Sequence, residues 1–143
     1  MTDPMAEDDE PQRCAILVDA ALPSGRAANA AAVIALTLGR LHPELVGSDM
    51  TDASGARHPG LIPIGITVLA ASVEAMREVR GKALNRGLEV VDFPIQGQQT
   101  NDYEEFRSAV TWVETADLVY VGVGVLGPRK SVGKVVGRFP LLA

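Results

Sequence analysis

The chain has 143 residues, of which 47% are hydrophobic and 22% charged, and its formal net charge is -5. This length fills one hydrophobic core and is short for two, so we expect a single domain. The composition is typical of a soluble globular protein and excludes a largely disordered chain, and no apolar run reaches the roughly 18 to 20 residues that span a bilayer.

The negative charge is concentrated at the amino terminus. Of the 18 carboxylates five lie within residues 1–12, which leaves 13 against 13 Lys and Arg in the rest of the chain. We therefore predict a flexible acidic tail over residues 1–12, followed by one α/β domain over residues 13–143. The tail has no apolar stretch that resembles a secretory signal, and the single cysteine, Cys14, fits a reducing compartment, so we expect a cytoplasmic protein.

The domain begins with a strand and a long helix. Residues 14–19 are a short apolar run, typical of a buried strand. A turn with Ser24 as its capping residue leads into residues 26–41, which lack proline and are rich in alanine, and this favours a helix. Residues 42–60 are rich in Pro, Gly and Asp, which indicates a long loop with a hairpin tip at residues 52–55.

A second strand and helix follow, then a third strand. The β-branched residues of 64–70 predict a strand, and Ser72 caps a helix that runs to about residue 86. Residues 88–93 predict a third strand that stops at Pro94. The glutamine-rich stretch 95–101 is expected to be a polar loop.

The last elements are a helix over residues 103–113, a strand over 118–121 and a closing helix over 128–136. Strands that alternate with helices in this way predict an α/β domain built in three layers, with helices on both faces of a sheet.

One glycine motif invites a cofactor interpretation. Gly122, Gly124 and Gly127 match the GxGxxG pattern that binds dinucleotides after a strand. That fingerprint needs a further strand and an acidic residue about 20 positions later, but no acidic residue follows Gly127. We therefore interpret these glycines as packing residues and predict no cofactor. The histidines, His42 and His58, have no metal-ligand spacing, so no metal site is predicted.

The start of the first helix has the features of an anion site. Gly25 and Arg26 follow a strand end and open a helix, where backbone N–H groups and the helix dipole attract a phosphate or carboxylate. Asn29 lies on the same helical face as Arg26. Arg129 and Lys130 belong to a basic carboxyl-terminal stretch that could add phosphate contacts. An ordinary helix start and an ordinary solvated helix would have the same residues.

Several segments together resemble a bacterial family known only as a domain of unknown function; they are residues 22–33, 51–55, 58–60, 102–103, 127–132 and 139–142. The resemblance extends from Cys14 to Ala143. That family is similar in fold to the type II peptidyl-tRNA hydrolases, so the resemblance implies a three-layer α/β/α sandwich with a mixed four-stranded sheet.

The resemblance also implies a set of site residues. The hydrolases carry an aspartate seven residues before a lysine, and Asp19 and Arg26 keep this spacing. Their histidine on the next turn corresponds to Val33. Their later aspartate and threonine correspond to Gln96 and Thr100. An amide cannot act as a general base, so this pattern implies weakened hydrolysis and a site better suited to holding a ligand.

Three functions compete at this point. The first is a protein that binds an anionic small molecule or an RNA end at the candidate residues Asp19, Gly25, Arg26, Asn29, Gln96, Thr100, Arg129 and Lys130. The second is a peptidyl-tRNA hydrolase or related esterase, with tRNA as partner and Asp19 or Asp92 as its base. The third is a structural or interaction protein.

The alanine-rich helix over residues 26–41 has too few polar residues to face water on all its outer sides. We therefore expect a homodimer that covers it. The alternative is that the excursion over residues 42–60 folds back over the same helix.

Overall fold

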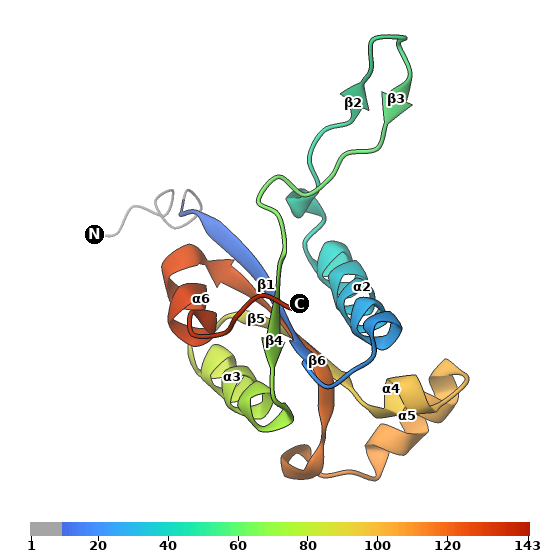
Figure 1. The fold of residues 1–143 in the computed structure, drawn as a ribbon, viewed down its shortest axis with the longest axis vertical. Helices are drawn as coiled ribbons and strands as arrows, with labels where there is room; N and C mark the ends of the chain where they lie inside the picture. The colour runs from blue at the N-terminus through green and yellow to red at the C-terminus, as the bar shows by residue number, and fades with distance from the viewer. Residues whose placement is uncertain (1–9) are drawn as a thin grey trace.

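The centre of the fold is a mixed four-stranded sheet in the order β4-β1-β6-β5 (Figure 1). The fold is that of a computed structural model, which describes residues 10–143. The strands are β1 (Gln12–Asp19), β4 (Thr67–Ala71), β5 (Glu89–Pro94) and β6 (Tyr120–Pro128). Strands β1 and β4 are parallel, and β6 runs antiparallel to both β1 and β5. The mixed sheet agrees with the prediction.

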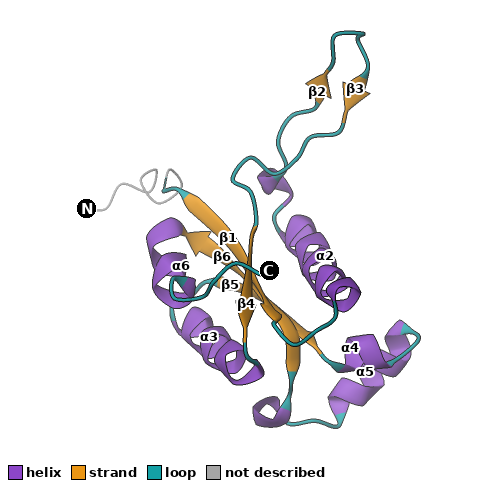
Figure 2. Cartoon of the chain, in the orientation of Figure 1, coloured by secondary structure: helices purple, strands orange, loops and turns teal. Residues whose placement is uncertain are grey.

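Helices cover both faces of this sheet (Figure 2). On one face lies α2 (Ser24–Leu41), and on the other lie α3 (Val73–Asn85) and α6 (Arg129–Val136). The short helix α4 (Gln96–Gln99) and the helix α5 (Tyr103–Thr111) follow β5, and Gln98 of α4 contacts α2. Two 3-10 helices, η1 (Pro43–Leu45) and η2 (Thr115–Asp117), complete the described elements. The predicted three-layer α/β/α sandwich is confirmed.

The alternation of side chains along the central strands divides the core into two layers. Ile16 and Val18 of β1 point toward α2 and contact the cluster that contains Ile34 and Leu38. Leu17, between them, points to the opposite layer under α3 and α6. Both faces of β1 are therefore buried, which explains why its sequence is a continuous apolar run.

The three glycines of the GxGxxG pattern lie inside β6, which is longer than the expected strand at residues 118–121. A β-carbon on Gly122 would lie 2.8 Å from Ile34 Cδ1, and one on Gly124 would collide with Ile34 Cγ2. A β-carbon on Gly127 would lie 2.5 Å from Leu88 Cδ2. The packing interpretation is thus supported, because these glycines let α2 and Leu88 approach the sheet closely.

A two-stranded arm projects from the carboxyl end of α2 (Figure 1). We use the term arm for residues 47–64, which contain β2 (Met50–Thr51) and β3 (Arg57–His58). The Asp52 carboxylate accepts hydrogen bonds from the Ser54 and Ala56 N–H groups and forms the tip, as predicted. The arm extends away from the body, so the alternative in which this segment covers α2 is wrong.

Several elements differ from the prediction, and the strand expected over residues 64–70 is β4 at Thr67–Ala71. Residues 95–101, expected to be a loop, contain α4, because the Thr100 N–H and hydroxyl both donate to the Gln96 carbonyl and close a helical turn. Strand β1 begins at Gln12, inside the expected acidic tail, because Gln12 pairs with Pro128 and the Arg129 N–H donates to the Pro11 carbonyl. Residues 1–9, most of the expected tail, lie outside the described residues.

Candidate functional site

Three strands end, and one begins, at the same end of the sheet. Asp19, the last residue of β1, pairs with Ala71, the last residue of β4, and at this end β5 leaves the sheet where β6 enters it. Asp19 is half-buried, and its Oδ1 accepts a hydrogen bond of 3.0 Å from the Ala21 N–H. The carboxylate therefore stabilises the turn into α2.

The turn from β1 leads to an uncapped helix end. Pro23 occupies the N-cap position, and Ser24, expected to be the cap, is the first helical residue. No side chain caps this end, and the first N–H groups of an α-helix have no partner within the helix. Gly25 is exposed, and a β-carbon added to it would meet nothing within 4 Å. The positive end of the α2 dipole is thus open to a ligand.

An amide from α4 holds the side chain of Asn29. Gln98 Nε2 donates to the Arg26 carbonyl at 2.9 Å and to Asn29 Oδ1 at 3.1 Å. Because Asn29 accepts through its oxygen, its Nδ2 is left to donate outward. Gln98 was not among the predicted site residues, although it lies in the same glutamine-rich stretch as Gln96. The helical turn of α4, which was not predicted, is what directs Gln98 toward α2.

Gln96 and Thr100 stabilise the helical turn of α4. The Thr100 hydroxyl donates to the Gln96 carbonyl at 2.8 Å. Gln96 Oε1 is buried and accepts no hydrogen bond from any residue in the described range. The hydroxyl expected to act on a ligand is therefore already engaged in closing the helix.

Arg129 and Lys130 lie far from the other candidates. They follow Pro128, which pairs with Gln12 at the start of β1, whereas Asp19 is at the end of β1. A strand of this length separates the two ends by roughly 20 Å. The structure therefore places Asp19, Gly25, Arg26, Asn29, Gln96 and Thr100 at one end of the sheet and Arg129 and Lys130 at the other.

The second carboxylate considered as a base lies under α3, on the other side of the sheet from α2. Asp92 Oδ2 accepts from Arg80 Nε at 2.7 Å, and this hydrogen bond raises the pKa of Arg80. The Arg80 guanidinium lies over the Tyr120 ring, 5.6 Å from its centre. Burial raises the pKa of the Tyr120 hydroxyl. Asp92 is therefore an ion-pair partner that the sheet separates from Arg26.

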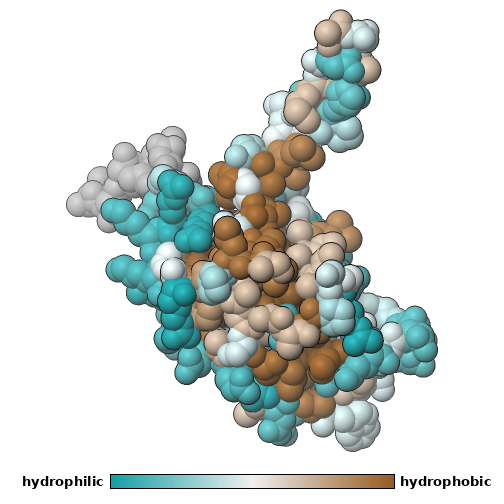
Figure 3. All heavy atoms as spheres, in the orientation of Figure 1, coloured by the Kyte–Doolittle hydropathy of each residue, from teal (hydrophilic) through white to brown (hydrophobic). Residues whose placement is uncertain are grey.

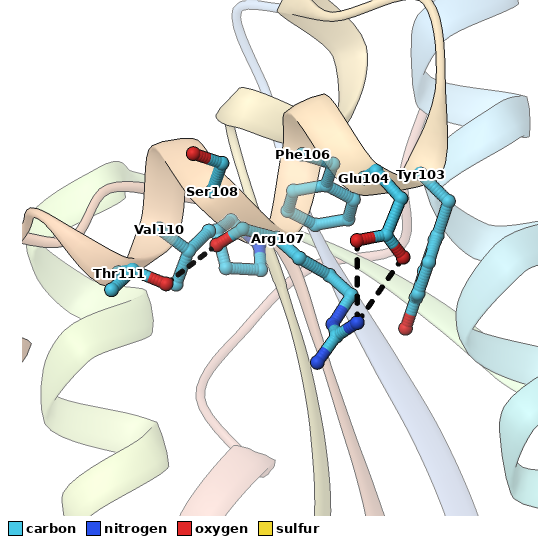
Figure 4. A pocket seen from close by; sticks show the side chains of 8 residues that line it. Tyr103, Glu104, Phe106, Arg107, Ser108, Val110 and Thr111 are labelled. Atoms are coloured by element: carbon cyan, nitrogen blue, oxygen red, sulfur yellow. Dashed lines mark hydrogen bonds and ion pairs between the residues drawn. The ribbon is translucent and has the colours of Figure 1, made fainter.

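A hollow of about 480 Å³ lies along α5 (Figure 4); it is lined by Pro94, Tyr103, Glu104, Phe106, Arg107, Ser108, Val110 and Thr111. Figure 4 shows that the Arg107 guanidinium is paired with Glu104, at 3.1 Å. The two charged side chains that line the hollow are thus paired with each other. None of the predicted site residues lines this hollow.

Residues 10–143 contain neither a cluster of metal-ligating side chains nor a helix that could span a membrane. Within this range, no group of three or more His, Cys, Asp and Glu side chains is arranged to hold a metal ion. None of the helices in the same range has the length and apolarity needed to cross a membrane.

The fold and the site together define an α/β sandwich with an open helix end beside its sheet. The chain belongs to the family Protein of unknown function (DUF2000), whose model matches residues 12–143. It is similar in fold to a protein of unknown function from Agrobacterium tumefaciens strain C58, with a TM-score of 0.85 and 20% identity over 92% of this chain and 98% of that one. No curated protein matches the sequence.

Proposed function

We propose that this protein binds the phosphate or carboxylate group of an anionic ligand at the amino end of α2 and does not hydrolyse it. The observation that carries the proposal is a set of groups that are all donors: the uncapped N–H groups of the first turn, the exposed Arg26 guanidinium and the outward Nδ2 of Asn29. Hydrogen-bond donors that converge in this way are suited to a negative charge.

The absence of a placed base supports binding over hydrolysis. Our proposal includes the resemblance to the type II peptidyl-tRNA hydrolases. In the pattern of those enzymes, a carboxylate occupies the position of Gln96. Asp19 is held by the Ala21 N–H, and Asp92 is paired with Arg80 on the other face of the sheet. A small anion and a terminal RNA phosphate share the chemistry that the α2 end would recognise.

The test combines binding and turnover. Inorganic phosphate and a short RNA with a terminal phosphate are titrated into the wild type and Arg26→Ala by calorimetry, and each protein is incubated with peptidyl-tRNA. Arg26→Ala should bind phosphate about 5- to 150-fold more weakly, which corresponds to about 1 to 3 kcal/mol for a charge-assisted hydrogen bond. Neither protein should release the peptide.

Arg129→Ala is the matched control, because it removes an exposed arginine at the other end of the sheet and should bind phosphate like the wild type. Tighter binding of the RNA than of free phosphate would identify the RNA end as the ligand, and equal binding would identify the small anion. Equal phosphate affinity of Arg26→Ala and the wild type would exclude the site, and peptide release at an ordinary enzymatic rate would establish the esterase instead.

We further propose that the protein is a cytoplasmic homodimer. The single cysteine is a buried free thiol, which fits a reducing compartment. The outer face of α2 is apolar and has no cover within residues 10–143, since the arm points away from it.

A further inference from the structure

Among residues 10–143, several exposed large apolar side chains lie on α2 and in the segments near it. Figure 3 shows hydrophobic residues gathered over this side of the molecule and continuing to the root of the arm. Leu36, on the outer face of α2, is 79% exposed, and Leu141, beside the edge strand β4, is 70% exposed. The other exposed large residues of this surface are Leu41, Val46, Leu61, Ile64 and Ile66.

This surface is large enough for a stable protein contact. Weighted by their exposed fractions, these side chains present on the order of 700 Å², close to the roughly 800 Å² that each partner contributes to a standard interface. Monomers rarely expose an apolar patch above a few hundred Å². Between Arg26 and Arg40, moreover, α2 has no charged side chain.

Small residues form a stripe along α2. We use the term stripe for Gly25, Ala28, Ala32, Ala35 and Gly39, which recur at alternating spacings of three and four and so share one side of the helix. Their small side chains leave hollows on both halves of α2: one beside Ala28 and Ala31 with a volume of about 350 Å³, and one beside Ala32 and Ala35.

We infer that two copies of the chain pair through α2 helices that run antiparallel, with the two-fold axis at Ala32. In this register Gly25 lies opposite the partner's Gly39, and Leu36 lies opposite the partner's Ala28. The stripe is nearly symmetric about Ala32, so each exposed Leu36 packs against the small side chain of the partner's Ala28. A parallel pair would instead place Leu36 against Leu36 and Ala28 against Ala28. This inference rests on the proposed homodimer and adds its interface and register.

The same register adds a charge to the anion site. Arg40, at the carboxyl end of α2, lies opposite the partner's Ser24, next to the uncapped helix end. Each site of the dimer would thus receive a guanidinium from the other copy, and an anion between Arg26 and the partner's Arg40 would reduce their mutual repulsion. This step rests also on the proposed anion binding.

Sedimentation equilibrium tests the interface. The wild type should have twice the 15.1 kDa mass of the chain, and Leu36→Glu should have the mass of a monomer. The matched control is Leu84→Glu, because Leu84 is 49% exposed on α3, on the opposite face of the sheet; it should remain a dimer. Since Leu36 is exposed, circular dichroism should show that Leu36→Glu is folded. A monomeric wild type, or a dimer that survives Leu36→Glu, would overturn the interface.

Cysteine cross-linking tests the register. Oxidation of mixed Ala28→Cys and Leu36→Cys proteins should give a covalent dimer, and each variant alone should give none. Each variant carries one new thiol, and in this register the two copies of either position lie about 12 Å apart along the helices, beyond the roughly 7 Å limit of a disulfide. The wild type is the control, since its only thiol, Cys14, is buried. A covalent dimer of Ala28→Cys alone would overturn the antiparallel register and leave the dimer itself standing.

Phosphate titration tests the shared site. Arg40→Ala should bind phosphate several-fold more weakly than the wild type, and Arg129→Ala should not. Unchanged affinity of Arg40→Ala would overturn the contribution of the second copy. A wild type that binds no phosphate would instead overturn the proposed function, and the sedimentation and cross-linking results would still decide the interface.

Discussion

The substitution Gly122→Ala tests whether the glycines of β6 are there for packing. The new β-carbon would lie 2.8 Å from Ile34 Cδ1 and 3.1 Å from the Leu17 carbonyl oxygen, and Ile34 is completely buried. Relief of such a contact inside a packed core costs about 1 to 3 kcal/mol. Alanine recovers about 0.5 to 1 kcal/mol, because glycine loses more backbone entropy on folding. We expect a net loss of about 0.5 to 2 kcal/mol.

A double-mutant cycle tests whether Ile34 Cδ1 is the atom with which the new β-carbon at position 122 collides. Ile34→Val removes Cδ1 and alone should cost about 0.5 to 1.5 kcal/mol. Combined with Gly122→Ala it should cost less than the sum of the two, by roughly 1 kcal/mol, because the colliding methyl is gone. Gly124→Ala is the comparison: its β-carbon would collide with Ile34 Cγ2, which valine retains, so Ile34→Val should give no such rescue.

Urea titrations followed by circular dichroism, at one protein concentration and with an unchanged m-value, measure these differences. Gly81→Ala is the control, since a β-carbon at Gly81 in α3 would meet nothing within 4 Å and should stabilise the helix by about 0.5 to 1 kcal/mol. If Gly122→Ala is as stable as the wild type, or if Ile34→Val rescues Gly124→Ala equally well, the packing explanation fails.

Three further predictions concern the helix cap at Ser72, the hydrogen bonds of Gln98 and the thiol of Cys14. Ser72→Ala removes the hydroxyl that accepts from the Ala75 N–H and should lower the free energy of unfolding by about 1 kcal/mol in urea, whereas Ser72→Thr should lower it much less. Gln98→Leu removes both hydrogen bonds from α4 to α2 and should weaken phosphate binding in calorimetry; unchanged binding would show that Asn29 needs no support. Burial raises the pKa of the Cys14 thiol, so above a pH of about 8.5 the unfolded chain loses this proton first and stability falls as pH rises. Cys14→Ala should have a shallower fall between about pH 8 and 9.5, and equal slopes would contradict this account.

Much of the fold follows from local signals. The apolar run at residues 14–19 predicts β1 because β1 is buried on both faces, and Ser72 caps α3 as its position indicates. The signal fails where long-range pairing decides the structure. Strand β6 includes three glycines, which local propensity disfavours in strands, because β1 and β5 pair with it on both sides and α2 needs the space.

The candidate site was predictable only in part. Gly25, Arg26 and Asn29 lie together because they share one helix turn, and sequence spacing is sufficient for that. Gln98 was missed because its role depends on α4, a four-residue helix that closes through Thr100. Arg129 and Lys130 were grouped with the others by charge alone, and only the antiparallel pairing of β6 with β1 places them at the opposite end.

The close approach of α2 to the sheet links the core, the site and the outer surface. Gly122 and Gly124 have no side chains, so Ile34 packs directly on the backbone of β6. A helix so close to the sheet can be anchored by α4 at its amino end, where Gln98 reaches the Arg26 carbonyl. Larger residues in β6 would lift α2 and lengthen that hydrogen bond. We therefore expect Gly122→Ala to weaken phosphate binding as well as stability, even though position 122 is buried beneath α2 and cannot touch a ligand at the helix end.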